Sequence, residues 1–184
     1  IYVFDEAHHL PSKSQNHLSR HVSIDAERRR IVTTQKTTAR IKKQFPQHTD
    51  LHRTIQSIAQ IDEALDASLV NLLPLLEQVF QQQSHLLNSS DELRFSHGVV
   101  PVTLKPIFHE LGQCYSLKSG VLQKTSDHVL ASFTDDRDND QANREALYGV
   151  LGELINNCDS AHLLCTDYAI GDDEAVIPTA RWLH

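Results

Sequence analysis

Residues 51–76, LHRTIQSIAQIDEALDASLVNLLPLL, carry the most regular apolar pattern in the chain. Apolar residues spaced three, four or seven apart fall on one side of an α-helix. The residues of this apolar stripe are Leu51, Ile55, Ile58, Leu65, Leu69, Leu72 and Leu76. Asp50 is suited to cap the helix, which we expect to continue to about Leu87. The pattern therefore predicts a long helix that buries one side.

Helical patterns also occur on both sides of this stretch. A capping box of Ser12 and Gln15 predicts a helix that ends before the Phe45-Pro46 pair. Further helices are predicted from about residue 103 to 133 and from about 139 to 165, with residues 88–101 as a connection. Residues 1–4 and 177–183 are the two short extended pieces. We expect a mainly α fold, a bundle of four to six helices with short strands at its two ends.

The composition limits the classes of protein to which the chain could belong. No run of about 18 apolar residues occurs, so we expect no membrane span. Three cysteines without a CxxC motif predict a reducing, cytoplasmic setting, with Cys158 and Cys165 buried on one helical side. The net charge of −7 is uneven: residues 1–43 hold nine Lys/Arg and four Asp/Glu, whereas the remainder holds eight and twenty. Such a chain is suited to hold nucleic acid along one edge only.

A pair of carboxylates follows the first apolar run, at Asp5 and Glu6. The carboxyl end of a buried strand is where open α/β sheets place their ligand chemistry. One carboxylate can hold Mg²⁺ through water, and the other can orient the water that attacks a nucleoside triphosphate. His8 can couple such a site to a neighbouring motif.

The segment IYVFDEAHHLP, residues 1–11, resembles the Walker B motif of superfamily-two helicases, and its His9-Leu10-Pro11 ending is similar to the DinG branch, relatives of the XPD helicases. The resemblance implies that Asp5 binds Mg²⁺, that Glu6 is catalytic and that His8 couples this site to a neighbouring motif. It also implies an ATP-dependent DNA helicase that moves along single-stranded or forked DNA in the 5′ to 3′ direction, in DNA repair or replication. Residues 1–11 would then end a motor domain, 12–176 would form a helical arch domain, and 177–184 would return to the motor.

The resemblance also implies parts that this sequence does not contain. No GxxxxGK[ST] phosphate loop is present, and the chain contains no methionine and opens within an apolar run. We therefore expect an internal piece of a longer protein, inactive as an ATPase by itself. A [4Fe–4S] cluster occurs in many relatives, but its ligands would precede Ile1, and three scattered cysteines do not supply the usual four thiolates.

A basic stretch in the first third of the chain is the candidate DNA contact. Basic groups and hydroxyls on one helix can follow a phosphate backbone without reading its sequence. The basic residues are Arg28, Arg29, Arg30, Lys36, Arg40, Lys42 and Lys43, and the hydroxyls are Thr33, Thr34, Thr37 and Thr38. An arch could also offer a surface to partner proteins. The alternative is an α-helical protein-interaction module in which the DEAH sequence is incidental and residues 51–76 form an exposed apolar groove.

Overall fold

The computed structural model describes residues 22–83, 93–95, 98–132, 138–170 and 181–183. These residues form four long helices, α2 (Ile24–Gln44), α3 (Thr49–Gln82), α4 (Lys105–Ser132) and α5 (Asp138–Ile170), and two short strands, β1 (Leu93–Arg94) and β2 (Trp182–Leu183). The fold is mainly α, as the sequence predicts. Among these helices, none has both the length and the apolar character that crossing a bilayer requires.

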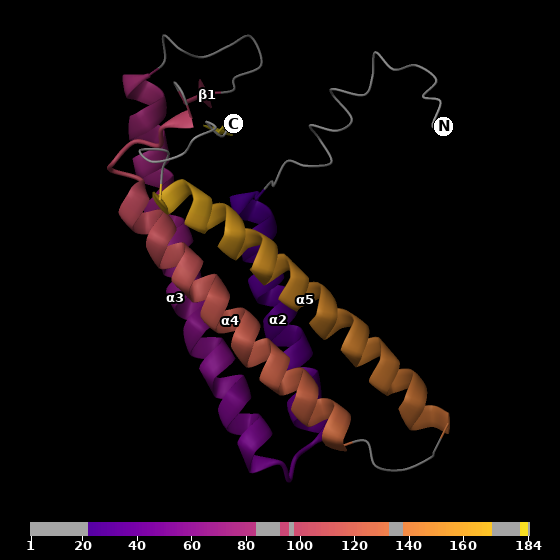
Figure 1. Ribbon diagram of the computed structural model, residues 1–184. Coiled ribbons are helices and arrows are strands. Elements are labelled where there is room, and N and C mark those ends of the chain that lie inside the picture. The colour runs from indigo at the N-terminus through magenta and orange to yellow at the C-terminus, as the bar shows by residue number, and fades with distance from the viewer. Residues whose placement is uncertain (1–21, 84–92, 96–97, 133–137, 171–180, 184) are drawn as a thin grey trace, which may run out of the picture.

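The four helices form an elongated bundle in which each runs opposite to the one before it (Figure 1). The most extensive packing joins α4 to α5, followed by that of α3 against α4. Helix α2 contacts both α3 and α5, less closely than α4 contacts its neighbours. The beginning of α2 and strand β2 lie at the same end of the bundle (Figure 1).

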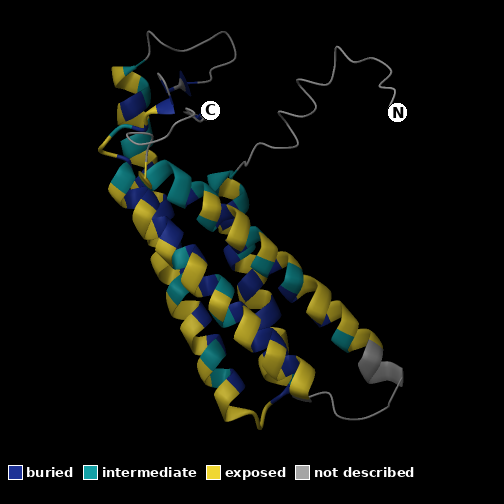
Figure 2. Cartoon of the chain, in the orientation of Figure 1, coloured by how far each residue is buried: buried dark blue, intermediate teal, exposed yellow. Residues whose placement is uncertain are grey.

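The apolar stripe of α3 lies in the core, which confirms the predicted helix. Six of its seven residues are buried and Leu76 is half-buried. They belong to one core cluster with buried apolar side chains of α2, α4 and α5, and the buried residues form a line along the interior of the bundle (Figure 2). Burying one leucine side chain contributes about 1.5–3 kcal/mol, so this stripe is a major source of stability.

Helix α2 begins with a serine cap and ends as predicted at Gln44. The Ser23 hydroxyl accepts a hydrogen bond from the Ala26 backbone N–H, 3.4 Å away. At the other end, the Phe45 N–H donates to the Ile41 carbonyl, and the Phe45 side chain is buried. The predicted capping box at residues 12–15 and the strand at residues 1–4 lie outside the described residues.

The connection predicted at residues 88–101 contains a strand that the sequence pattern does not indicate. Strand β1 pairs antiparallel with β2, Leu93 opposite Leu183. Two residues are too few to show an alternating pattern, and the partner strand lies about 90 residues away in the chain. The extended piece predicted at residues 177–183 contains a strand at Trp182–Leu183, which confirms that part of the prediction.

The segment 181–183 is bound to the bundle through Arg181. Its buried guanidinium donates to both Asp167 carboxylate oxygens, each 2.9 Å away, and to the Gly98 carbonyl at 2.8 Å. Gly98 has a φ of 73°, a conformation that side chains with a Cβ rarely adopt. Arg181 thus holds together Gly98, which follows β1, and Asp167 of α5.

Candidate nucleic-acid interface

The predicted ATP-site residues Asp5, Glu6 and His8 lie outside the described residues. The described candidate site is therefore the basic stretch, all seven residues of which belong to α2. The helix separates these residues into groups with different surroundings.

Two of the seven basic residues are engaged by carboxylates of the bundle. Arg28 forms an ion pair with Asp66 of α3, 2.8 Å away, and this hydrogen bond raises the pKa of the guanidinium. Arg30 pairs with Glu27, whose side chain is buried. Because these guanidinium groups already have anionic partners, they are poorer candidates for phosphate contacts than the sequence suggests.

Four others lie on one solvent-facing side of α2, and we call them the basic row: Arg29, Lys36, Arg40 and Lys43. Positions 7, 11 and 14 residues beyond the first fall within about 40° of it around a helix of 3.6 residues per turn. All four are exposed. The row is about 21 Å long, at 1.5 Å per residue.

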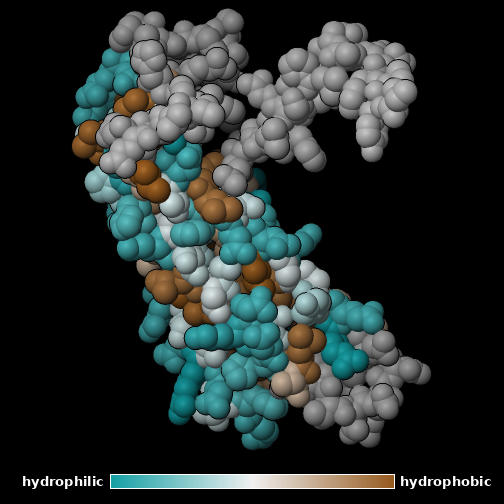
Figure 3. Space-filling model, viewed as in Figure 1, coloured by the Kyte–Doolittle hydropathy of each residue, from teal (hydrophilic) through white to brown (hydrophobic). Residues whose placement is uncertain are grey.

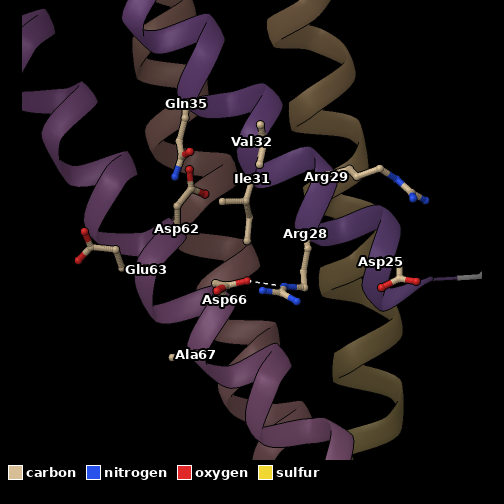
Figure 4. A pocket seen from close by; sticks show the side chains of 10 residues that line it. All are labelled: Asp25, Arg28, Arg29, Ile31, Val32, Gln35, Asp62, Glu63, Asp66 and Ala67. Carbon is tan, nitrogen blue, oxygen red and sulfur yellow. Dashed lines mark hydrogen bonds and ion pairs between the residues drawn. The ribbon is translucent and has the colours of Figure 1, made fainter.

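Within the row, Arg40 donates a hydrogen bond to the Asn143 side chain of α5 at 3.2 Å, and Arg29 extends away from Arg28 (Figure 4). Lys42 is also exposed but faces another direction around the helix. The row thus presents four positive charges in one line.

The predicted contribution of the threonines is mostly wrong. Thr34, Thr37 and Thr38 are buried, Thr34 and Thr38 on the side of α2 opposite to the basic row. The Thr34 hydroxyl donates to the Arg30 carbonyl and that of Thr38 to the Gln35 carbonyl. Of the four hydroxyls, only that of Thr33 is on an exposed residue. The prediction grouped the threonines with the basic residues because the sequence alone did not show which side of this helix faces the core.

A groove of about 680 Å³ runs between α2 and α3 beside the row, and we call it the α2–α3 groove (Figure 4). It is lined by Asp25, Arg28, Arg29, Ile31, Val32, Gln35, Asp62, Glu63, Asp66 and Ala67. Neither helix forms this groove alone, so sequence reasoning missed it.

Asp62 is the buried charge of the groove. Its side chain is 1% exposed, and its Oδ1 atom lies 2.6 Å from the ammonium of Lys118, which is 3% exposed. The Oδ2 atom accepts no hydrogen bond from any residue that the structure describes. Burial raises the pKa of the Asp62 carboxyl, and the Lys118 charge opposes this increase. The sequence does carry a signal for this site, because Asp62 occupies a core position of the α3 stripe, four residues after Ile58 and three before Leu65.

The two predicted core cysteines, Cys158 and Cys165, are buried on one side of α5 as free thiols, which confirms that expectation. Burial raises the pKa of each thiol to about 12, so both are protonated at neutral pH and are weak nucleophiles. Within the described part of the chain, no group of three or more His, Cys, Asp or Glu side chains is arranged to hold a metal ion.

Comparison of the chain with protein-family models, with curated proteins and with solved structures found no match.

Proposed function

We propose that the chain is a fragment of a DinG-type ATP-dependent DNA helicase and that its helical bundle is the arch domain. In this proposal the basic row lies against the phosphates of a single DNA strand as the strand passes the arch. The parent protein would act in the cytoplasm on single-stranded or forked DNA. The proposed domain limits remain 1–11, 12–176 and 177–184.

The observation that carries the DNA contact is the basic row itself. Four exposed cations in one line, in a chain of net charge −7, provide a local site for a polyanion that the rest of the surface would repel. The position of α2 and β2 at the same end of the bundle also supports the arch, because a domain inserted into another must leave and return at neighbouring points (Figure 1).

The ATP chemistry of the parent rests on the DEAH sequence. Asp5 would hold Mg²⁺ through water, Glu6 would orient the attacking water, and His8 would couple hydrolysis to movement. The phosphate-binding loop, and the ligands of any [4Fe–4S] cluster, would come from other parts of the parent.

The test is binding of the whole chain to a labelled single-stranded oligonucleotide, followed by fluorescence anisotropy at several salt concentrations. Four phosphate contacts predict a log–log salt slope of about −2.8, which weakens binding about 50-fold between about 50 and 200 mM salt. The variant Lys36→Gln/Lys43→Gln removes two of these contacts and should reduce the slope to about −1.4.

A matched control removes two charges from other sides of the bundle, with Arg53→Gln on α3 and Lys124→Gln on α4, both at exposed positions. The control should keep the wild-type slope. If the control and row variants changed binding equally, the row would not be the contact site.

The alternative, a protein-interaction module, depended on an exposed apolar groove along residues 51–76, but that stripe is mostly buried in the core. Exposed apolar side chains do occur elsewhere, including Leu117 on α4 and Leu163 on α5. In the face shown in Figure 3, hydrophobic residues lie in separate groups among hydrophilic ones. No described surface therefore favours this function over DNA contact.

A further inference from the structure

Helix α2 is the most weakly packed of the four helices. Its contacts with α3 and α5 are much less extensive than those of α4 with the same two helices. Besides two isoleucines, its buried side consists of four polar residues, Glu27, Thr34, Thr37 and Thr38. Because apolar burial is the main force that holds a helix against its neighbours, α2 should separate from the bundle more readily than the others.

Two polar contacts that join α2 to its neighbours lie at the surface. The side chains of the ion pair between Arg28 and Asp66 of α3 are 49% and 41% exposed. Arg40, which donates a hydrogen bond to Asn143 of α5, is exposed as well. Water and salt weaken exposed contacts of this kind, so they add little to the attachment of α2.

The other three helices can stay packed when α2 leaves. Helix α4 packs extensively against both α3 and α5, and these three helices supply most of the buried apolar residues. Helix α2 is joined to α3 by a short turn, in which the His48 N–H donates to the Phe45 carbonyl at 3.3 Å. This turn lies at the end of the bundle opposite to the beginning of α2, where it can act as a hinge (Figure 1).

Electrostatic attraction also contributes to the attachment of α2. The helix contains seven Lys/Arg and two Asp/Glu, a net charge of +5, whereas residues 45–184 contain eight and twenty, a net charge of −12. A polyanion along the basic row neutralises the positive helix and places its own charge beside an acidic chain. A phosphate at Arg40 also competes with Asn143 for the guanidinium. A bound strand should therefore weaken the attachment.

We propose that α2 opens as a unit from the packed α3–α5 core, and that a polyanionic strand bound along the basic row promotes this opening. The effect of the strand rests on the proposed function, because the row must hold it. The bundle then has two shapes, closed when the row is empty and more often open when a strand occupies it.

Cys158 of α5 is a natural reporter of this opening. Its side chain is 5% exposed. Burial raises the pKa of its thiol, and the nearby carboxylate of Glu27 on α2 raises it further. A covered thiol reacts with N-ethylmaleimide only when the structure opens, so its alkylation rate measures how often opening occurs. Mass spectrometry of the digested chain resolves Cys158 from Cys114 and Cys165.

Matched conservative variants test whether α2 opens by itself. Ile31→Val weakens the packing of α2, and Ile107→Val does the same for α4 at a similar exposed fraction, 6% against 8%. We expect Ile31→Val to speed alkylation of Cys158 about fivefold. Ile107→Val should leave the rate unchanged, because its contacts persist when only α2 leaves. Equal rates in the two variants would mean that Cys158 reacts through unfolding of the whole bundle, which overturns the inference.

The effect of the strand is measured on the wild-type chain with and without saturating oligo-dT. Fluorescence anisotropy of the labelled oligonucleotide establishes in the same buffer that it is bound. We expect bound oligo-dT to speed alkylation of Cys158 by about fivefold or more. The partly exposed Cys114 of α4 is the internal reference, and its rate should not change.

The outcomes separate this inference from the proposed function. If oligo-dT binds but alkylation of Cys158 is unchanged or slower, the coupling is wrong and the basic row remains the contact site. If oligo-dT does not bind, both the proposed DNA contact and the coupling are wrong.

Discussion

At the scale of single residues, the pair of Asp62 and Lys118 is costly to bury. Both side chains are almost fully buried, so both charges lose their hydration on folding. The attraction between them offsets only part of that cost, because the Asp62 Oδ2 atom gains no hydrogen bond from the described residues. We expect a buried ion pair of this kind to specify how α3 and α4 align more than it stabilises the fold.

Removing one member of this pair should be far more damaging than removing both. We expect Lys118→Met to lower the free energy of unfolding by about 3–5 kcal/mol, because it leaves the Asp62 carboxylate buried without a counter-charge. Asp62→Leu/Lys118→Met should be as stable as the wild type or more stable. Urea denaturation followed by circular dichroism measures both, and equal losses in the single and double variants would contradict this account.

The same carboxyl predicts a pH dependence. Burial raises the pKa of Asp62 above its ordinary value of 3.8, with Lys118 acting in the opposite direction. The folded chain therefore binds this proton more tightly than the unfolded chain. The contribution of Asp62 to stability rises as pH falls through the folded pKa towards 3.8, and it is lost as pH rises.

The expected result is that the free energy of unfolding of the wild type, minus that of Asp62→Asn, increases from neutral pH to about pH 4. Denaturation curves at several pH values give this difference directly. The same comparison with Asp50→Asn, at an exposed position on α3, controls for the effect of acid pH on the stability of the rest of the chain. A difference that stays flat or decreases towards acid pH would show that the Lys118 charge outweighs burial.

At the scale of elements, α2 differs from the other helices in the polarity of its buried side. Glu27, Thr34, Thr37 and Thr38 accompany only two buried isoleucines, Ile31 and Ile41. Threonine is a weaker helix former than alanine or leucine, so α2 depends on its cap and on the bundle for stability. The basic row lies on the solvent-facing side of α2, so its charges are not buried in the core.

The end of the chain should be a stabilising element of the bundle through Arg181. We expect Arg181→Ala to lower the free energy of unfolding by about 2 kcal/mol, because charged hydrogen bonds to Asp167 and one to the Gly98 carbonyl are lost. The Phe95 N–H, which donates to the Arg181 carbonyl, should exchange with solvent faster.

Hydrogen exchange measured by NMR gives the exchange rate of the Phe95 amide, with the core amides of α4 as an internal reference. Arg53→Ala removes an exposed ion pair with Asp50 and should cost less than about 0.5 kcal/mol. Unchanged exchange at Phe95 in Arg181→Ala would mean that β1 and β2 are held by other contacts.

At the scale of the whole molecule, the beginning of α2 and strand β2 lie at the same end of four antiparallel helices, the arrangement that the proposed insertion requires (Figure 1). Its interior contains the apolar stripe of α3 and the buried sides of α4 and α5, so the bundle has a core of its own. The basic row lies on its outside, where a strand could pass without entering the core.

This organisation predicts that the chain binds DNA without consuming ATP. With Mg²⁺, ATP and a single-stranded oligonucleotide, we expect phosphate release no higher than in a blank, because the sequence has no phosphate-binding loop. A malachite-green assay provides the measurement. Turnover that disappears in Glu6→Gln would contradict the expectation and place a complete ATP site in this chain.

The sequence by itself determined the helices and the core side of α3, because a 3.6-residue period identifies the side of a helix that must leave water. It also supplied the DEAH segment on which the helicase proposal depends. Only the tertiary structure decided that Arg28 pairs with a carboxylate of another helix, since Asp66 lies on α3, and which side of α2 faces the core. The β1–β2 pair and the α2–α3 groove likewise arise between segments distant in the chain, and no local pattern encodes the space between two helices.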